Sequence, residues 1–466
     1  MIPTSEAVAV TSDWLVPVDT SPIPNGFIVI EDGTIRFVGK ELPTCYQSVR
    51  LVRLPGFAIL PGLVNSHCHL EFSDLESPIP AGNSFPDWIG SLLAFRRAKN
   101  NAPEQLALNR QAAIASGIRE SYQAGVRWVV DMATEPWSAA WIENEVASIA
   151  AMSPVALAPK APIVVLPCIE LLDIVENRFE STLALANKHM AAPKCTTGVG
   201  QIGFAPHAPY TASRKVTQWC AGLPLREKRL VTMHLAESKE ELQWLQHQNG
   251  PFSELLAPIL AHGTTVGEQT YFDKLGQVTE HVALLSKSWR ATIAHGNYLS
   301  RQDLISLAER ASTMGVVHCP RTHRHFGHLH DASQFPPTNR YPFAERVALG
   351  VRHFLGTDSR ASNPDLNLWT EAKLVRAEQT ELKSEQILKM MTTDAAEFLD
   401  LGDEYGAIRT GSPAALTAIK HDRVISRDGL VDDASTLYDA LLEEGTVSAP
   451  LEWVMANLQS NVRTNL

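Results

Sequence analysis

Two histidines one residue apart, His67 and His69, end an apolar stretch of the chain that begins at residue 60. Side chains at positions i and i+2 of a β-strand project from the same face, so these two imidazoles can converge on one point. Histidine is a common metal ligand, but two ordinary polar residues at the end of a strand explain the pair equally well. The pair indicates a metal site only if the chain supplies further ligands.

Two further candidate ligands, His234 and Asp358, end other apolar segments. A divalent ion such as zinc takes about four nitrogen or oxygen donors, and these residues with His67 and His69 supply three imidazoles and one carboxylate. Such an ion lowers the pKa of a bound water and so provides hydroxide as a nucleophile. The six cysteines are scattered without a Cys-x-x-Cys pair, so we expect reduced, packed thiols rather than a disulfide framework or a thiolate zinc site.

Two more residues can take part in chemistry at this site. Glu237 follows His234 by three residues, where its carboxylate can reach the water without binding the metal. We expect it to act as general acid and base, the alternative being an ordinary exposed acid. His295 would orient the hydroxide or polarise the reacting group, although its spacing leaves open that it is a fourth imidazole ligand.

The elements that carry these residues alternate between apolar strands and amphipathic helices. Continuous apolar strands separated by helices predict a parallel sheet covered on both faces, and eight such units predict a (β/α)8 TIM-type barrel, with an open doubly wound sheet as the rival. In a barrel the polar strand ends meet at one mouth. The long loop predicted from about Leu70 to Ala107 would be a lid or would pack on the rim. The predicted strands are Leu60–His69, Val126–Met132, Ile163–Glu170, Gln201–His207, Leu230–Glu237, Ala291–Gly296, Gly315–Cys319 and Arg352–Asp358.

Both ends of the chain have a different, hairpin-rich character. Short β-branched runs are separated by Asp-Gly and Pro-Asn-Gly turns in the first sixty residues, and similar runs return after residue 400. We therefore expect one small β-sandwich domain built from residues 1–58 and 401–466, with the barrel formed by residues 59–400 between them.

Composition limits the classes of partner. The chain has 466 residues, 45% of them hydrophobic, and a net charge of −11, with no basic block or tail. This balance argues against a nucleic-acid surface or a membrane-binding patch and favours a small-molecule substrate. No apolar run has the roughly 18–20 residues of a spanning helix, and the first residues lack a signal-peptide pattern, so a cytoplasmic location is expected.

Several motifs carry a resemblance to a known superfamily. They are residues 61–69, which end in His-Cys-His, Pro-His-Ala-Pro-Tyr-Thr at 206–211, His-Leu-Ala-Glu-Ser at 234–238, Ile-Ala-His-Gly at 293–296, Val-His-Cys-Pro at 317–320 and Gly-Thr-Asp-Ser at 356–359. In type and order they resemble the amidohydrolase superfamily, in the aminohydrolase and chlorohydrolase branch that includes cytosine, guanine, S-adenosylhomocysteine and aminodeoxyfutalosine deaminases. The resemblance spans nearly the whole chain.

The resemblance implies a hydrolytic deaminase with one metal ion. The ligands would be His67, His69, His234 and Asp358, and the catalytic residues Glu237, His295 and Asp358. The ion would be zinc, although iron suits the same donors. Hydroxide would attack the amino-bearing carbon of a purine-like heterocycle or nucleoside, of the aminodeoxyfutalosine or adenosine type, and release ammonia. Hydrolysis of a cyclic amide, another C–N bond or a carbon–halogen bond is the alternative, and a binding protein without activity is a third reading that the complete ligand set disfavours.

Contacts with substrate are implied for three residues. His207 ends the fourth strand, where binuclear members of the superfamily carry a lysine, and this histidine would contact substrate or support the site. Trp88 would stack on a base or sugar, or anchor its loop. Arg321 opens a His-rich stretch, residues 321–330, that replaces the usual Ser-Asn and glycine-rich turn and would shape the substrate pocket; a second metal site there is less favoured than a solvated loop. A homodimer is common in the superfamily.

Overall fold

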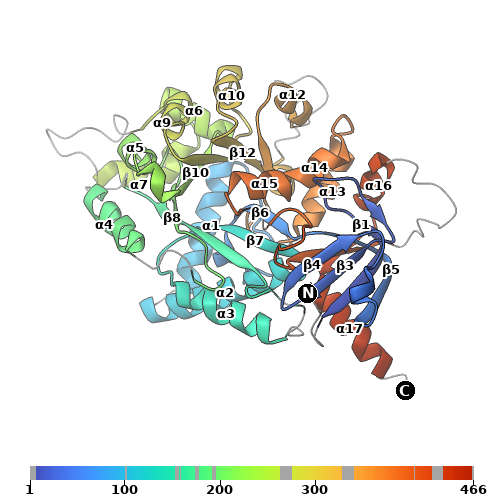
Figure 1. Cartoon of the computed structure of the whole chain (residues 1–466). Coiled ribbons are helices and arrows are strands. Elements are labelled where there is room, and N and C mark those ends of the chain that lie inside the picture. Colours follow the sequence, from blue (N-terminus) through green and yellow to red (C-terminus); the bar gives the residue numbers. More distant parts are fainter. Residues whose placement is uncertain are drawn as a thin grey trace.

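The computed structural model describes residues 7–99, 102–152, 157, 159–173, 178–191, 196–262, 275–327, 341–402, 405–421 and 434–463. Its largest sheet has eight strands, all parallel and hydrogen-bonded in chain order. Most of their residues are buried, as the continuous apolar segments predict, because side chains fill the interior on one face and helices cover the other (Figure 1). The strands are β6 (Leu63–Cys68), β7 (Val126–Ala133), β8 (Val164–Leu171), β9 (Gly203–Pro206), β10 (Leu230–Leu235), β11 (Arg290–His295), β12 (Met314–His318) and β13 (His353–Leu355).

The first and last of these strands close the sheet into a barrel. A parallel bridge joins Cys68 to Asp358, and the backbone N–H groups of Thr357 and Asp358 both donate to the carbonyl oxygen of His67, each at 3.1 Å. Gly356 permits this approach, because a Cβ there would lie 2.8 Å from the Cβ and carbonyl oxygen of His67. The predicted (β/α)8 barrel is confirmed over an open sheet, and all eight predicted strands are present.

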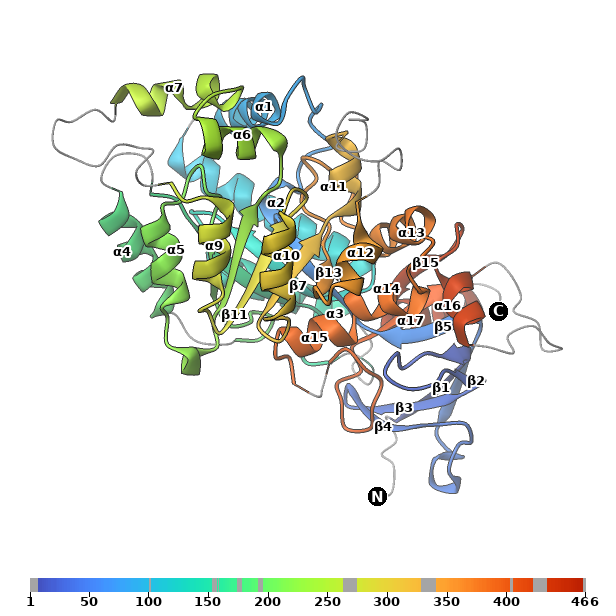
Figure 2. The same cartoon turned by 90° about the horizontal axis from the view of Figure 1, so that it is seen from above.

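Most helices of the described chain surround the barrel (Figure 2). In the described residues no helix is long and apolar enough to cross a membrane. The helices are α1 (Phe85–Lys99), α2 (Pro103–Gln123), α3 (Ala139–Met152), α4 (Phe179–Met190), α5 (Arg214–Ala221), α6 (Lys239–His247), α7 (Phe252–His262), α9 (Val278–Leu285), α10 (Arg301–Ala308), α11 (Pro320–His325), α12 (Phe343–Ala348), α13 (Leu368–Glu378), α14 (Ser384–Met390), α15 (Thr393–Phe398), α16 (Ala434–Leu441) and α17 (Leu451–Arg463).

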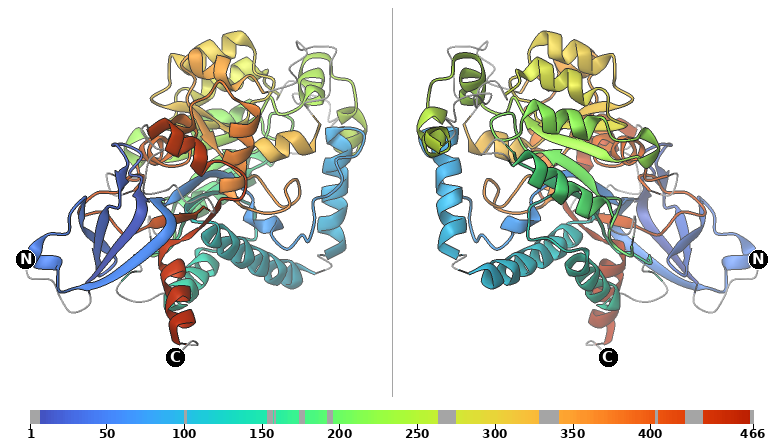
Figure 3. Two further views of the ribbon diagram at one scale, coloured as in Figure 1. Left: turned by 90° about the vertical axis from the view of Figure 1, so that its right-hand side faces the viewer. Right: turned by 90° about the vertical axis from the view of Figure 1, so that its left-hand side faces the viewer.

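Segments from both ends of the chain meet in a second sheet beside the barrel (Figure 3). Its strands pair in the order β15-β14-β5-β1-β3-β4, with β2 added to β1. Strands from the two ends of the chain, which the sequence predicts to meet in one small β domain, are thus hydrogen-bonded into a single sheet. A buried ion pair between Arg127 of β7 and Glu452 of α17, at 2.6 Å, ties the barrel to this end of the chain. The strands are β1 (Val8–Leu15), β2 (Ile23–Pro24), β3 (Phe27–Glu31), β4 (Thr34–Gly39), β5 (Arg50–Pro61), β14 (Leu416–Lys420) and β15 (Val447–Pro450).

Two segments expected to be loops contain helices. Helix α1 occupies residues 85–99 of the predicted loop after the first strand, and α2 begins at residue 103. Helix α11 includes residues 321–325 of the predicted His-rich loop, whose residues 328–330 lie outside the described part of the chain. Both helices lie above the barrel mouth, and Trp88 of α1 packs edge-on against Phe326, which follows α11, with ring centroids 4.9 Å apart. Long-range packing therefore orders segments that local sequence signals indicate as loops.

Candidate active site

Three imidazoles and one carboxylate converge at the carboxyl ends of β6, β10 and β13. The Nε2 atoms of His69 and His234 are 3.1 Å apart. The Oδ1 atom of Asp358 lies 3.6 Å from Nε2 of His69 and 3.8 Å from Nε2 of His67. The structure thus brings together the four residues that the sequence predicts as metal ligands.

Hydrogen bonds to neighbouring residues occupy one polar atom of His234 and one of Asp358, and the other polar atom of each side chain can bind a shared metal ion. The Nδ1 atom of His234 lies 3.0 Å from the carbonyl oxygen of His207, so Nδ1 carries the proton and Nε2 keeps its lone pair. The Oδ2 atom of Asp358 accepts a hydrogen bond from Ser362 at 2.8 Å, and its Oδ1 atom points to the cluster. Both ring nitrogens of His67 are buried without a hydrogen-bond partner in the described residues. A divalent cation would satisfy these atoms, so the donor set fits such an ion.

Burial sets the protonation of the cluster. Removal from water lowers the pKa of His67 and His69 well below the ordinary value and lowers that of His234 to about 4. Neutral imidazole is the form that binds metal. Burial also raises the pKa of Asp358 to about 7, and the charge of a bound cation would counteract this effect and favour the carboxylate.

Glu237 lies beside the cluster and its backbone is held from two sides. Its N–H group donates to Glu241 at 2.9 Å, and its carbonyl oxygen accepts from the side chain of Asn297, also at 2.9 Å. Its Oε1 atom is 3.5 Å from Nε2 of His295. Burial and the nearby Asp358 raise the pKa of Glu237 well above its ordinary value, which makes its carboxylate a stronger proton acceptor.

The turn that carries His295 is fixed by a buried arginine. His295 and Gly296 both have positive φ values, 65° and 56°, a strained conformation for a residue other than glycine. Arg346 donates to the carbonyl oxygen of Gly296 at 2.8 Å and to that of Asn297 at 3.0 Å, and it also donates to the hydroxyl of Tyr341 at 2.7 Å. These bonds hold the strained turn and, through Asn297, the backbone of Glu237.

A cavity of about 320 Å³ opens over the cluster and has one apolar and one polar wall. Helix α1 contributes much of the apolar wall, including Trp88, whose ring stacks on Phe85 with centroids 5.8 Å apart. Trp88 is 8% exposed and lines the cavity, so it both anchors α1 and faces the space above the ligands. Tyr210, Leu255 and Leu256 extend this wall from other elements.

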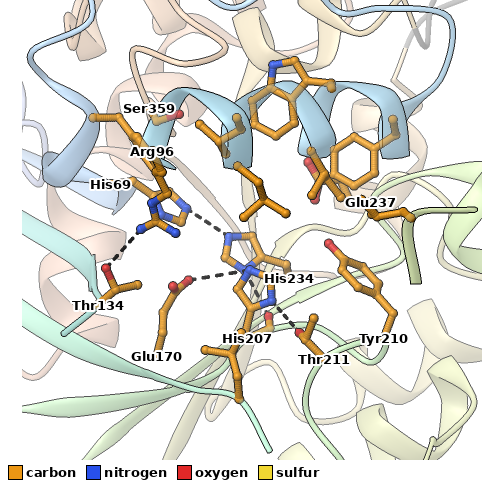
Figure 4. Close-up of a pocket in the computed structure, with 18 of the residues that line it drawn as sticks. His69, Arg96, Thr134, Glu170, His207, Tyr210, Thr211, His234, Glu237 and Ser359 are labelled. Atoms are coloured by element: carbon orange, nitrogen blue, oxygen red, sulfur yellow. Dashed lines mark hydrogen bonds and ion pairs between the residues drawn. The ribbon is translucent and has the colours of Figure 1, made fainter. Parts of the chain in front are cut away.

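The polar wall contains residues that sequence reasoning missed (Figure 4). Arg96 of α1 pairs with Glu71 and donates to Thr134 at 3.2 Å. Glu170, near the end of β8, faces His207, whose Nδ1 atom is 2.6 Å from the hydroxyl oxygen of Thr211. Burial raises the pKa of Glu170 to about 7 and lowers that of His207 to about 4. Glu170 ends the third predicted strand, and a polar residue at a strand end indicates a place at the barrel mouth, so the sequence did contain a signal for this residue.

Arg321 does not line the cavity, contrary to the expected substrate contact. Its guanidinium pairs with Glu371 at 2.7 Å and with Asp365 at 2.8 Å, and it also donates to the carbonyl oxygens of Asp365 and Asn367. Its role is to fasten α11 to α13. In the part of the chain that the structure describes, no histidine of α11 belongs to a three-residue group with metal-binding distances, so a second site there finds no support.

A parallel barrel with a histidine and carboxylate cluster at its carboxyl end is typical of barrel enzymes whose site can bind a divalent metal ion. The sequence model of the Amidohydrolase family matches residues 58–447, and the chain belongs to this family.

Individual relatives agree with this assignment. The chain is 26% identical over 416 residues to a 5-methylthioadenosine/S-adenosylhomocysteine deaminase of Pyrococcus furiosus, covering 86% of this chain and 83% of that one. Its fold is similar to that of Helicobacter pylori aminofutalosine deaminase in complex with methylthio-coformycin, with a TM-score of 0.73, 18% identity and coverage of 94% and 97%. It is also similar to that of an adenosine deaminase from Xanthomonas campestris with bound zinc, with a TM-score of 0.64, 20% identity and coverage of 93% and 89%.

Proposed function

We propose that this protein is a metal-dependent deaminase that hydrolyses the bond between the ring carbon and the amino group of a purine-like nucleoside, of the adenosine or aminodeoxyfutalosine type. One observation carries the proposal: four side chains that could bind a metal ion converge beside a buried acid, Glu237, at the floor of a cavity in an amidohydrolase barrel. The name of the Pyrococcus furiosus relative supports the nucleoside class. The small-molecule substrate, a homodimer and a cytoplasmic location remain predictions from the sequence.

His67, His69, His234 and Asp358 would hold one divalent ion, with zinc as the expected metal. When bound, the ion would activate a water as nucleophile and stabilise the negative charge that develops during attack. Iron suits the same three imidazoles and carboxylate.

Glu237 would move the protons of the reaction. Its carboxylate takes a proton from the attacking water and gives it to the ring nitrogen next to the amino-bearing carbon, while the water oxygen bonds to that carbon. A second proton from the added hydroxyl then passes to the amino group, the C–N bond breaks and ammonia leaves. His295, 3.5 Å from Glu237, orients the nucleophile, and Asp358 accepts a hydrogen bond from it.

The cavity walls fit a flat heterocycle. The cavity volume of about 320 Å³ lies at the lower end of the range for small-molecule sites, roughly 300–1,000 Å³. Trp88 and its apolar neighbours would pack against one face of the substrate and exclude water. Exclusion of water strengthens the interactions between Glu237 and the developing charges.

The proposal is tested by measuring ammonia released from adenosine, guanosine, cytidine and the free bases by the zinc-loaded protein. We expect turnover of at least one aminopurine nucleoside with one ammonia per product. Silence on every aminated compound, together with hydrolysis of a cyclic amide or a chlorinated triazine, would instead assign the site to the other bond types of the superfamily.

A further inference from the structure

The carboxylate of Glu170 has no part in the chemistry proposed above, although it is buried in the same cavity. Glu170 is 7% exposed and lines the polar wall, between Thr134 and His207 (Figure 4). Its Oε1 atom is buried and accepts no hydrogen bond from the described residues. An unsatisfied buried acceptor costs about 1–3 kcal/mol, so such an atom in a binding cavity indicates a contact with the ligand.

The neighbouring cation is engaged elsewhere. Arg96 pairs with Glu71, which is also paired with Arg110 at 2.7 Å, and it donates to Thr134. No ion pair joins Arg96 to Glu170 among the described contacts, although the positive charge of Arg96 acts on the carboxylate from nearby. The carboxylate of Glu170 is therefore left as an acceptor that faces the cavity.

A second acceptor lies next to it. The Nδ1 atom of His207 is 2.6 Å from the oxygen of Thr211, whose hydroxyl is directed to the carbonyl oxygen of Ala208 at 3.2 Å. The proton of the imidazole is therefore on Nδ1, and Nε2 is an acceptor. This Nε2 atom lies 3.9 Å from Oε1 of Glu170, too far for a hydrogen bond between them. Two adjacent acceptors match a ligand that presents two adjacent donors.

A second metal ion is the competing occupant. Glu170, His207 and His234 have ligand atoms within 4.8 Å of one another. The Nε2 atom of His234, however, faces His69 at 3.1 Å and belongs to the first cluster, which leaves two ligands for a second ion. The charge of Arg96 also disfavours a cation at this place.

We propose that Glu170 determines specificity for a ribonucleoside by accepting a hydrogen bond from one hydroxyl of a vicinal sugar diol, while Nε2 of His207 accepts from the other. This proposal rests on the proposed function, which supplies the nucleoside. Glu170 and Glu237 lie on opposite sides of His234 (Figure 4), so a substrate whose base lies at Glu237 extends its sugar toward Glu170. Free bases and dideoxynucleosides lack these donors and leave both acceptors unsatisfied.

The test measures binding of adenosine and 2′,3′-dideoxyadenosine by calorimetry, in a Glu237→Gln background in which turnover is expected to be slow. We expect adenosine to bind on the order of 10- to 100-fold more tightly than the dideoxy compound. Adding Glu170→Leu should bring this ratio close to one by weakening adenosine alone, with metal content unchanged. Glu170→Gln, which keeps the shape of the side chain, should give an intermediate ratio. Glu180→Gln, on the exposed surface of α4, is the matched control and should keep the full ratio.

Three results would overturn the proposal. The first is equal binding of adenosine and the dideoxy compound by the Glu237→Gln protein that keeps Glu170. The second is an unchanged preference for adenosine after Glu170→Leu, and the third is loss of metal in the Glu170 variants. The last result would make Glu170 a metal ligand. If the protein with Glu237 releases no ammonia but the binding preference depends on Glu170, the deaminase assignment fails and the sugar site stands.

Discussion

Replacing Arg346 by methionine removes a buried cation that holds the strained turn after β11. Arg346 is 2% exposed and donates three hydrogen bonds, at 2.7–3.0 Å, to two carbonyl oxygens and one hydroxyl. Methionine fills similar space but leaves both carbonyl oxygens buried without a donor. Leaving two buried carbonyl oxygens without a donor costs about 1–3 kcal/mol for each of them. We expect the free energy of unfolding to fall by the sum of these two costs.

The same substitution should lower kcat more than it raises KM. The turn carries His295, and Asn297 within it holds the carbonyl oxygen of Glu237, so both groups lose their fixed positions relative to the reacting atoms. Arg346→Lys keeps the charge but loses the two-pronged contact with the carbonyl oxygens, and should recover part of the stability and of kcat.

Urea unfolding and steady-state kinetics of the two variants provide the assay. Arg301→Met is the matched control, because Arg301 lies on the neighbouring helix and forms an exposed ion pair with Glu345 at 3.9 Å. Such a surface pair contributes at most about 1 kcal/mol. Equal unfolding midpoints for Arg346→Met and Arg301→Met would refute the reasoning about the buried turn.

Three further predictions follow from single side chains. Glu237→Gln should lower kcat about 10²- to 10⁴-fold because it removes the proton carrier, and near-normal turnover would exclude Glu237 from that role. A hydrogen bond with His189 holds the pKa of Glu135 at about 2, so the stabilisation is present above its ordinary pKa and is lost as the pH falls toward 2. Glu135→Gln should therefore be less stable than the natural protein at about pH 6, and thermal unfolding should show the difference shrinking between about pH 5 and pH 3; a constant difference would contradict this linkage. Gly62→Ala should destabilise the fold by about 1–3 kcal/mol or more, since its Cβ would lie 2.1 Å from Cγ of Arg127, whereas Gly90→Ala, with open space around it, should not.

The barrel and the position of its candidate ligands could be predicted because each strand carries its own signal. Continuous apolar segments that end in His or Asp mark buried strands whose polar ends meet at one mouth, and this rule places His67, His69, His234 and Asp358 together without any knowledge of contacts. Glu170 obeys the same rule at the end of the third strand and could have been included.

Other features depend on partners far away in the chain. Helix α1 lies in a segment with nearby prolines and glycine, which indicates a loop, and its apolar face becomes evident only when Phe85 and Trp88 meet Phe252 and Phe326. The partner of Arg321, Glu371, lies fifty residues further on and is buried, so the sequence could not show that this arginine is engaged. Long-range contacts of this kind leave no local pattern.

Metal analysis of the purified protein tests the central claim most directly. After zinc loading and removal of free metal, we predict one ion per chain in the natural protein and in Glu237→Gln, and a loss of the ion in Asp358→Ala. No bound ion in the natural protein, or loss of the ion in Glu237→Gln with retention in Asp358→Ala, would contradict the assignment of ligands and proton carrier.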